Sequence, residues 1–330
     1  MSRELLLIKL SSLGDVIHGF AMLGDLAKAM PDVKVSWVVE EAFADLVSAH
    51  PLVKNVIVVP LRRLRKEKRW WWSKQWREMR KQLRTQRYFK VVDAQGLLKS
   101  ALLMRMIRTD ERIGYDNVSA REPLAALAYH QCIRVEKGLH AVERMRLLMG
   151  GAFDYQPEGQ ADYGLPLWQP SDTKQLLFFH GTTWRSKQLP EKTWHELIKL
   201  ANHAGFNVVL PWGNVEERER AERLARSGAK VLPKLSLVEL QQEIYRSAGV
   251  ISVDTGLGHL AAACGAPVLG IFGPTDATLT GMMGIHAKNL SHANPCMKKD
   301  CHVHGGTEEN SCMHIWQAGE IWETFLTLQE

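Results

Sequence analysis

Two short polar segments of this 330-residue chain have the residue types that group transfer needs. The first, Ser11–Asp15, follows an apolar strand expected at 5–10 and holds a single carboxylate, Asp15. The second, 254–259, follows the β-branched run Val250–Val253, which is typical of a strand buried in a parallel sheet. A carboxylate can accept the proton of an acceptor hydroxyl, and a cradle of N–H groups can stabilise a departing diphosphate. The two segments therefore favour transfer of a group from a nucleotide-activated donor.

The segment at 254–259 is expected to bind phosphate because a helix begins there. Asp254 and Thr255 are residue types that start helices, and Gly256 lets a ligand approach the backbone. Unpaired N–H groups and the positive end of the helix dipole would face the anion. His259 follows Thr255 by four residues, so both can lie on one side of the helix.

A loop after the strand expected at 175–179 adds Thr182, Thr183 and Lys187 to the phosphate site. Each candidate also has a purely structural interpretation. Asp15 could cap the helix expected at 16–30, Asp254 could be a cap that never touches a ligand, and Lys187 could lie on the surface.

Strands alternate with helices through the whole chain, which predicts open parallel sheets. The expected strands are 5–10, 33–39, 53–60, 91–93, 175–179, 206–210, 250–253 and 268–272. The fold class is therefore α/β, with two Rossmann-like, doubly wound domains that face each other across a cleft. Ligands would bind at the carboxyl ends of the strands.

The domain boundaries follow from a change in composition. A segment rich in Pro, Gly, Asp and Gln predicts a linker at 161–174, between an acceptor-binding domain at 1–160 and a donor-binding domain at 175–312. A C-terminal helix is expected within 313–330, and it could pack back on the N-terminal domain.

The charge of +6 is concentrated in one stretch. Residues 62–90 include thirteen Lys or Arg, two acids, and the tryptophans Trp70, Trp71, Trp72 and Trp76. Such a stretch indicates nucleic acid, an anionic membrane surface or an acidic substrate, or else a solvated helix face with buried Trp. We favour an interaction surface, because Trp is costly to expose in water and suits a membrane interface.

Other classes of protein are disfavoured. The first strand lacks the G-x-G-x-x-G of dinucleotide-binding folds, and the chain has no P-loop motif. No apolar run approaches the roughly 18 residues of a membrane helix, and the N-terminus does not resemble a signal peptide, so we expect a cytoplasmic protein. Five cysteines without a signal peptide argue against a disulfide framework.

Nine motifs, in order along nearly the whole chain, resemble the lipopolysaccharide heptosyltransferases. They are KLSSLGDVIH at 9–18, WVVEE at 37–41, DAQGLLKS at 93–100, AREPLA at 120–125, HAVER at 140–144, HGTT at 180–183, LPWG at 210–213, SVDTGL at 252–257 and GPTD at 273–276. The motifs at 121–123 and 140–144 are most similar to the heptosyltransferase I branch, which adds the first heptose to Kdo on lipid A.

The resemblance implies a GT-B glycosyltransferase of lipopolysaccharide inner-core biosynthesis, with ADP-heptose as donor. The transfer would be inverting and independent of metal or other cofactor. Asp15 would be the general base for the Kdo hydroxyl. The donor would be held by Thr182, Thr183, Lys187, Glu217, Asp254, Thr255, Gly256 and His259.

The resemblance also implies where the anionic acceptor, Kdo-lipid A, binds. Its carboxylates and phosphates would meet Arg62, Arg63, Arg65, Lys66, Lys99, Arg121 and Arg144. Arg121 and Arg144 could instead pair with Glu122 and Glu143. The Trp cluster would rest on the anionic inner face of the inner membrane of a Gram-negative cell, making the enzyme a peripheral membrane protein. We expect a monomer and no nucleic-acid partner.

One region departs from the heptosyltransferase I pattern. Cys296, Cys301 and Cys312 lie near several histidines, in a segment more similar to heptosyltransferase II relatives. Three Cys and one His could bind zinc, but reduced structural thiols are the favoured interpretation. Transfer of a second or later heptose is therefore an alternative. The more distant alternatives are a non-catalytic nucleotide-sugar binder and a nucleic-acid binder.

Overall fold

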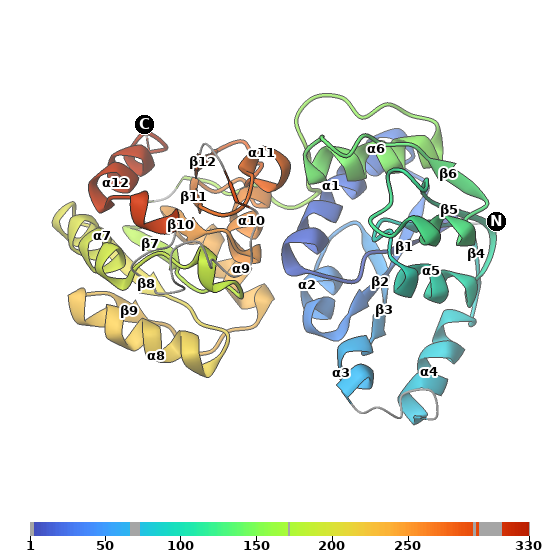
Figure 1. The fold of residues 1–330 in the computed structure, drawn as a ribbon, viewed down its shortest axis with the longest axis horizontal. Helices are drawn as coiled ribbons and strands as arrows, with labels where there is room; N and C mark the ends of the chain where they lie inside the picture. Colours follow the sequence, from blue (N-terminus) through green and yellow to red (C-terminus); the bar gives the residue numbers. More distant parts are fainter. Residues whose placement is uncertain (1–2, 67–72, 171, 293–294, 297–311, 330) are drawn as a thin grey trace. The chain divides into compact units, whose positions relative to one another are not determined.

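The computed structural model describes all residues except 1–2, 67–72, 171, 293–294, 297–311 and 330. The chain divides into two compact units, Met1–Leu165 and Pro166–Glu330 (Figure 1). The division falls inside the segment 161–174, where the composition predicted a linker.

The first unit is built on a parallel sheet with the strand order β3-β2-β1-β4-β5-β6. The strands are β1 (Glu4–Ile8), β2 (Lys34–Glu40), β3 (Val53–Val59), β4 (Arg87–Asp93), β5 (Arg108–Tyr115) and β6 (Gln131–Ile133). The helices are α1 (Leu13–Ala29), η1 (Glu41–Phe43), α2 (Ala44–Ser48), α3 (Leu61–Lys66), α4 (Lys74–Leu83), α5 (Leu98–Arg105), η3 (Pro123–Ala128) and α6 (Ala141–Phe153).

Successive side chains of a strand point to opposite faces of the sheet, so this unit has a hydrophobic core on each face. Leu6 and Ile8 of β1 and Val38 of β2 point to the face covered by α3, α4, α5 and η3. Trp37, the neighbour of Val38, points to the opposite face and contacts Phe20 of α1 edge to face, with 5.6 Å between ring centroids. Helix α1 packs along α6 on that face.

The second unit repeats the architecture with the strand order β12-β11-β10-β7-β8-β9. Its strands are β7 (Gln175–Phe179), β8 (Asn207–Leu210), β9 (Lys230–Val231), β10 (Gly249–Val253), β11 (Val268–Phe272) and β12 (Ala287–Ser291). Its helices are η4 (Arg185–Lys187), α7 (Glu191–His203), α8 (Val215–Leu224), η5 (Ala225–Ser227), α9 (Leu237–Tyr245), α10 (Gly256–Ala263), α11 (Ala277–Thr280), η7 (Cys312–Ile315) and α12 (Ala318–Leu326). Two doubly wound α/β units therefore confirm the predicted fold class.

The C-terminal helix expected within 313–330 is α12, which belongs to the second unit. Helix α12 packs on α7, and Ile321, Trp322 and Phe325 enter the core of the second unit. The helix thus buries its apolar face in the core of the second unit.

Four strands away from the sheet centres were not predicted from the sequence. They are β5, β6, β9 and β12. The amino half of β5 is charged, and its Asp110 and Glu111 pair with Arg87 and Lys90 of β4. Because these positions hold charged pairs, the sequence of β5 lacks the alternation of apolar and polar residues that predicts a strand. Strands β6, β9 and β12 lie at sheet edges, so burial imposes little pattern on their sequences.

Within the described ranges, no helix combines the length and the apolar character that crossing a membrane requires.

Candidate active site

Asp15 lies in the first turn of α1, directly after the carboxyl end of the central strand β1. Its Oδ2 atom accepts hydrogen bonds from the backbone N–H of Ser12 at 2.9 Å and from the Ser12 hydroxyl at 3.0 Å. The capping interpretation is thus correct for one carboxylate oxygen. The other oxygen, Oδ1, faces Lys9.

Lys9 is the partner of Oδ1. Its Nζ atom lies 3.2 Å from Oδ1 of Asp15, and its side chain is only 4% exposed, whereas that of Asp15 is 32% exposed. The same ammonium donates to the carbonyl oxygen of Ala94. Burial raises the pKa of Asp15, but the Lys9 charge and the Ser12 N–H outweigh it and hold the pKa below its ordinary value. Asp15 is therefore an ionised carboxylate whose side chain stays about a third exposed, so a ligand can reach it although both oxygens have partners.

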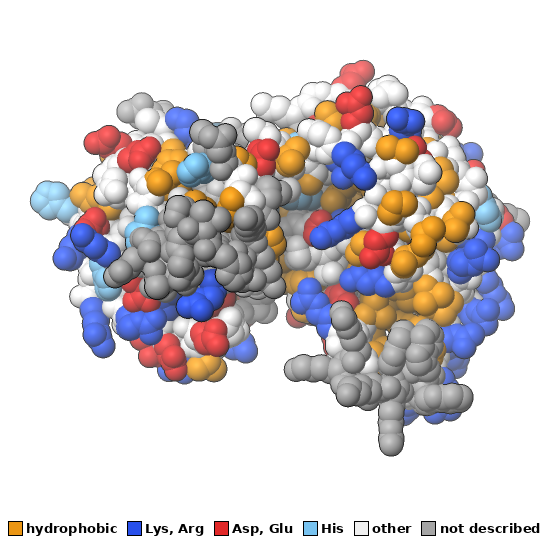
Figure 2. Space-filling view, viewed as in Figure 1, with side chains coloured by type: hydrophobic (Ala, Val, Ile, Leu, Met, Phe, Trp, Pro, Cys, Tyr) orange, Lys and Arg blue, Asp and Glu red, His pale blue; other side chains and the backbone are white. Residues whose placement is uncertain are grey.

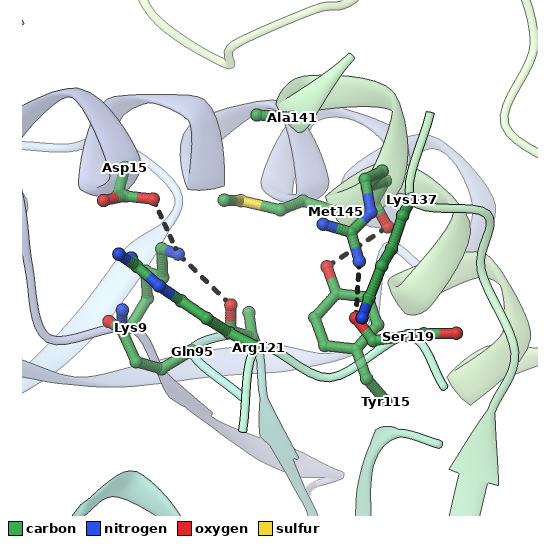
Figure 3. A pocket seen from close by; sticks show the side chains of 11 residues that line it. Lys9, Asp15, Gln95, Tyr115, Ser119, Arg121, Lys137, Ala141 and Met145 are labelled. Atoms are coloured by element: carbon green, nitrogen blue, oxygen red, sulfur yellow. Dashed lines mark hydrogen bonds and ion pairs between the residues drawn. The ribbon is translucent and has the colours of Figure 1, made fainter. Parts of the chain in front are cut away.

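A pocket of about 380 Å³ opens beside this pair, within the first unit (Figure 3). Asp15, Lys9, Gln95 and Arg121 lie at one end, and Tyr115, Ser119 and Lys137 lie at the other. Ala94, Ala141, Arg144 and Met145 complete the lining. The pocket joins one carboxylate to several cations, which suits an anionic ligand that carries a reactive hydroxyl.

Gln95 is oriented by the backbone around it. Its Oε1 atom accepts hydrogen bonds from the N–H groups of Leu10 at 3.0 Å and Ser11 at 3.2 Å. Because only the carbonyl oxygen of an amide accepts, these bonds assign the orientation of the side chain. The loop that carries Gln95 is held by the buried Asp93, which accepts from Gln95 N at 2.8 Å and from the Tyr129 hydroxyl at 2.8 Å.

Two of the predicted acceptor residues lie in this pocket. Arg121 extends toward Asp15 (Figure 3). Arg144 lies over the Tyr115 ring, with Cζ 5.2 Å from the centroid, and donates to the Ser119 carbonyl at 2.7 Å. The acids considered as their partners are engaged elsewhere. Glu143 pairs with Arg146 at 3.0 Å, and Glu122 accepts from the Leu98 backbone.

Three further predicted acceptor residues, Arg62, Arg63 and Lys99, do not line this pocket. Arg62 and Arg63 line a second cavity of about 510 Å³ with Glu40, Glu41 and Ala42. Arg63 pairs there with Glu41 at 3.2 Å, and Arg62 lies over the Phe43 ring at 5.6 Å. Lys99 is exposed on α5 and lines neither cavity. Arg65 and Lys66 end α3, and their side chains are not described.

The Trp cluster is only partly within the described residues. Trp76 is 5% exposed and packs in the core beneath α4. The membrane-contact prediction is wrong for this residue, because its spacing from Met79 and Leu83 places it on the inner face of the helix. Trp70, Trp71 and Trp72 lie outside the described residues.

In the second unit, Asp254 is the centre of a buried charge cluster. Its Oδ2 atom contacts Nζ of Lys187 at 2.5 Å and accepts from the Thr275 hydroxyl at 2.6 Å. Nε2 of His259 lies 3.7 Å from Oδ1. Burial raises the pKa of Asp254, but His259 and Lys187 together hold it below its ordinary value. The Lys187 side chain is 14% exposed and lies over the Trp184 ring at 4.4 Å, so it is not a free surface lysine.

The other predicted donor residues adjoin this cluster at the carboxyl ends of β7, β8 and β10. Thr182 donates to the Asp254 carbonyl at 3.2 Å, and the neighbouring Thr183 is exposed. Thr255 occupies the N-cap position of α10 without a side-chain capping hydrogen bond, and Gly256 is the first residue of the helix. Glu217 accepts from Gly213 N at 2.7 Å and lies so close to Gly181 that a Cβ there would meet its Cδ atom at 2.7 Å. The predicted set is therefore one continuous group of loops within the second unit.

A zinc site finds no support in the described ranges. They contain no group of three His, Cys, Asp or Glu residues that could hold a metal ion. Cys301 lies outside the described residues. Cys296 is exposed and Cys312 is half-buried.

Lys9, Gln95, Tyr115, Lys137 and Thr275 are site residues that the sequence analysis did not assign. Lys9 carried a signal, since it interrupts an apolar strand and a buried lysine needs a charged partner. Thr275 lies 21 residues from Asp254 and had no such signal, because pairing of β10 with β11 brings the two together.

The chain is similar to known proteins over most of its length. Residues 76–305 match the family model of glycosyltransferase family 9 (heptosyltransferase). The lipopolysaccharide heptosyltransferase 1 of Pseudomonas aeruginosa is 45% identical over 321 residues, covering 93% of this chain and 89% of that protein.

Two solved structures of E. coli heptosyltransferase WaaC are similar over the full chain. The structure with ADP has 36% sequence identity and a TM-score of 0.86, covering 98% of this chain and 99% of that chain. The structure with ADP-2-deoxy-2-fluoro heptose has 36% identity and a TM-score of 0.82, covering 99% and 100%. These likenesses confirm the resemblance seen in the motifs and the predicted GT-B fold class.

Proposed function

Since the chain belongs to glycosyltransferase family 9, we propose that it transfers L-glycero-D-manno-heptose from ADP-heptose to a hydroxyl of Kdo in Kdo-lipid A. The observation that carries the proposal is the ionised Asp15, held by Lys9 at the end of a pocket lined with cations. A Kdo residue has a carboxylate for the cations and hydroxyls for the base, so its chemistry matches this pocket.

Asp15 is the proposed base. As the acceptor oxygen bonds to the anomeric carbon of the heptose, its proton passes to the Asp15 carboxylate, and the bond from that carbon to the diphosphate breaks with its electrons leaving on ADP. Attack opposite the leaving group inverts the anomeric centre. Because the pKa of Asp15 lies below its ordinary value, the base is ionised at neutral pH, and it takes the proton once bond formation has made the hydroxyl acidic.

The second unit is the proposed donor site. Lys187 would share its charge between Asp254 and the donor diphosphate, and the N-terminus of α10 with Thr255 and Gly256 would donate to phosphate oxygens. The proposed diphosphate position is also adjoined by Thr182, Thr183 and His259. The heptose would donate hydrogen bonds to Asp254, and the ribose would donate to Glu217. Arg121, Arg144 and Lys137 would hold the acceptor. Arg62, Arg63, Arg65, Lys66 and Lys99 are proposed to meet its more distant phosphates.

The proposed location is the cytoplasmic face of the inner membrane, where a monomer would act as a peripheral enzyme on a lipid-borne acceptor. Support comes from the basic surface of the first unit and from the lipopolysaccharide enzymes that the chain resembles.

Product mass tests the proposal. The purified protein is mixed with ADP-heptose and de-acylated Kdo-lipid A, beside an Asp15→Asn variant. We expect a gain of one heptose that the variant nearly loses. Transfer only to an acceptor that already carries heptose would assign the sister activity, and no transfer to either acceptor by a folded, ADP-binding protein would refute the proposal.

A further inference from the structure

Four large leucine side chains lie exposed together on the first unit. Leu98 and Leu102 of α5 are 49% and 46% exposed, and Leu124 and Leu127 of η3 are 63% and 78% exposed. The two helices pack against each other, and the spacings i, i+4 and i, i+3 place each pair on one side of its helix. We call these four residues the leucine patch.

The leucine patch is not needed to close the core. Leu103 and Met104 of α5 and Ala125 and Ala128 of η3 already fill the inner side of both helices. A helix that covers a sheet normally turns polar residues outward, whereas these two helices present apolar side chains on both sides. Such contiguous apolar exposure indicates a contact surface.

The charge around the leucine patch indicates what covers it. Helix α4, in the same layer, turns Trp76 and Met79 inward and exposes four cations, Lys74, Arg77, Arg80 and Lys81. Helix α5 adds the exposed Lys99 and Arg105. Figure 2 shows hydrophobic side chains gathered on this unit with Lys and Arg at their margins. Apolar side chains among cations match a leaflet of anionic lipid, where phosphates meet the cations and leucines enter the acyl region.

The leucine patch adjoins the proposed acceptor pocket. Arg121 lines that pocket, and η3 begins two residues later at Pro123. The intervening Glu122 accepts from the Leu98 backbone N–H at 2.5 Å, which ties the start of α5 to the start of η3. A sugar in the pocket would therefore be close to a surface that can hold its lipid.

We propose that the leucine patch inserts into the anionic leaflet that carries the acceptor, so that α5 and η3 are the membrane-docking surface. The inference rests on the proposed function in one respect, the lipid-borne acceptor. It assigns the contact to described apolar side chains beside the pocket, with the basic face of α4 supplying the electrostatic attraction.

Vesicle binding tests the surface directly. Leu124→Ser/Leu127→Ser is compared with Leu167→Ser/Val215→Ser, a matched control whose side chains are 58% and 68% exposed in the second unit. With vesicles of phosphatidylethanolamine and phosphatidylglycerol, the patch variant should lose at least tenfold in partitioning, and the control should bind as the unchanged protein does. Equal partitioning of the two variants would overturn the inference.

Transfer assays and the molecular mass of the protein in solution distinguish the other outcomes. Transfer to de-acylated acceptor should be the same in both variants and the unchanged protein, while transfer to acceptor embedded in vesicles should fall at least tenfold in the patch variant alone. Unchanged transfer to the embedded acceptor would contradict the inference and leave the enzyme assignment standing. Absence of transfer by the unchanged protein would instead refute the proposed function. If the unchanged protein self-associates without lipid and the patch variant does not, the leucine patch is a contact between copies and the lipid inference is wrong.

Discussion

The Nζ atom of Lys9 lies 3.2 Å from Oδ1 of Asp15 and 3.2 Å from the carbonyl oxygen of Ala94. One buried ammonium thus joins the loop after β1 to the loop after β4. It also compensates a carboxylate that burial alone would make harder to ionise. The position and the charge of the proposed base therefore depend on the same neighbour.

Replacing Lys9 should expose this dependence. In Lys9→Met, burial of Asp15 persists without the compensating cation, so the pKa of Asp15 should rise by about 1–3. The base is lost as pH falls through its pKa, so the acidic limb of kcat against pH should move to higher pH. Lys28→Met, which removes the surface pair with Asp162, is the control. A limb that does not move would contradict the role assigned to Lys9.

Lys187 should govern donor affinity. Lys187→Gln removes the cation proposed to share the diphosphate, and a hydrogen bond to a charged group contributes about 1.5–3 kcal/mol, which is roughly a tenfold to hundredfold loss in affinity. Calorimetric titration with ADP measures the change. Lys192→Gln, on the exposed side of α7, should bind ADP as the unchanged protein does. Equal affinities of the two variants would remove Lys187 from the donor site.

Arg121 should affect the acceptor and not the donor. Arg121→Gln removes a charge beside Asp15, so the KM for de-acylated Kdo-lipid A should rise about tenfold or more while ADP affinity stays the same. Steady-state kinetics with each substrate varied in turn separate the two effects. Arg134→Gln, at an exposed position that does not line this pocket, is the comparison. A rise in the donor KM instead would place Arg121 elsewhere in the mechanism.

Acid should destabilise both units through buried histidines. Burial lowers the pKa of His50 to about 4, and burial with the nearby Arg220 lowers that of His180 to about 4. An unfolded histidine has a pKa of about 6.5, so the unfolded state binds more protons between these values, and stability falls as pH drops through that window. The loss approaches about 3 kcal/mol per histidine as pH falls to the folded-state pKa of about 4.

Urea unfolding at neutral and mildly acidic pH measures this effect. In His180→Gln the change in unfolding midpoint between the two pH values should shrink, whatever the variant does to stability itself. His203→Gln, at an exposed position on α7, should keep the full pH dependence. An unaltered pH dependence in His180→Gln would show that this histidine is not the titrating group.

Local patterns were sufficient for much of the fold. The continuous apolar runs of β1, β7, β10 and β11 predict buried central strands, and they are buried along nearly their whole length. The outer strands lack such continuous apolar runs, as the charged start of β5 shows. The basic stretch at 62–90 shows the same limit, since its composition cannot distinguish Trp76, which fills the core, from an exposed tryptophan.

The sequence by itself determined which loops carry the proposed site residues, because a polar turn after an apolar run marks the carboxyl end of a strand. Asp15 and Asp254 both follow from that rule. Only the tertiary structure decided their partners. Pairing of Ile8 with Asp93 in parallel strands brings Lys9 to Ala94 and Leu10 to Gln95, across 85 residues of sequence. Strand register sets these distances, and register depends on packing across the whole sheet, which no single segment contains.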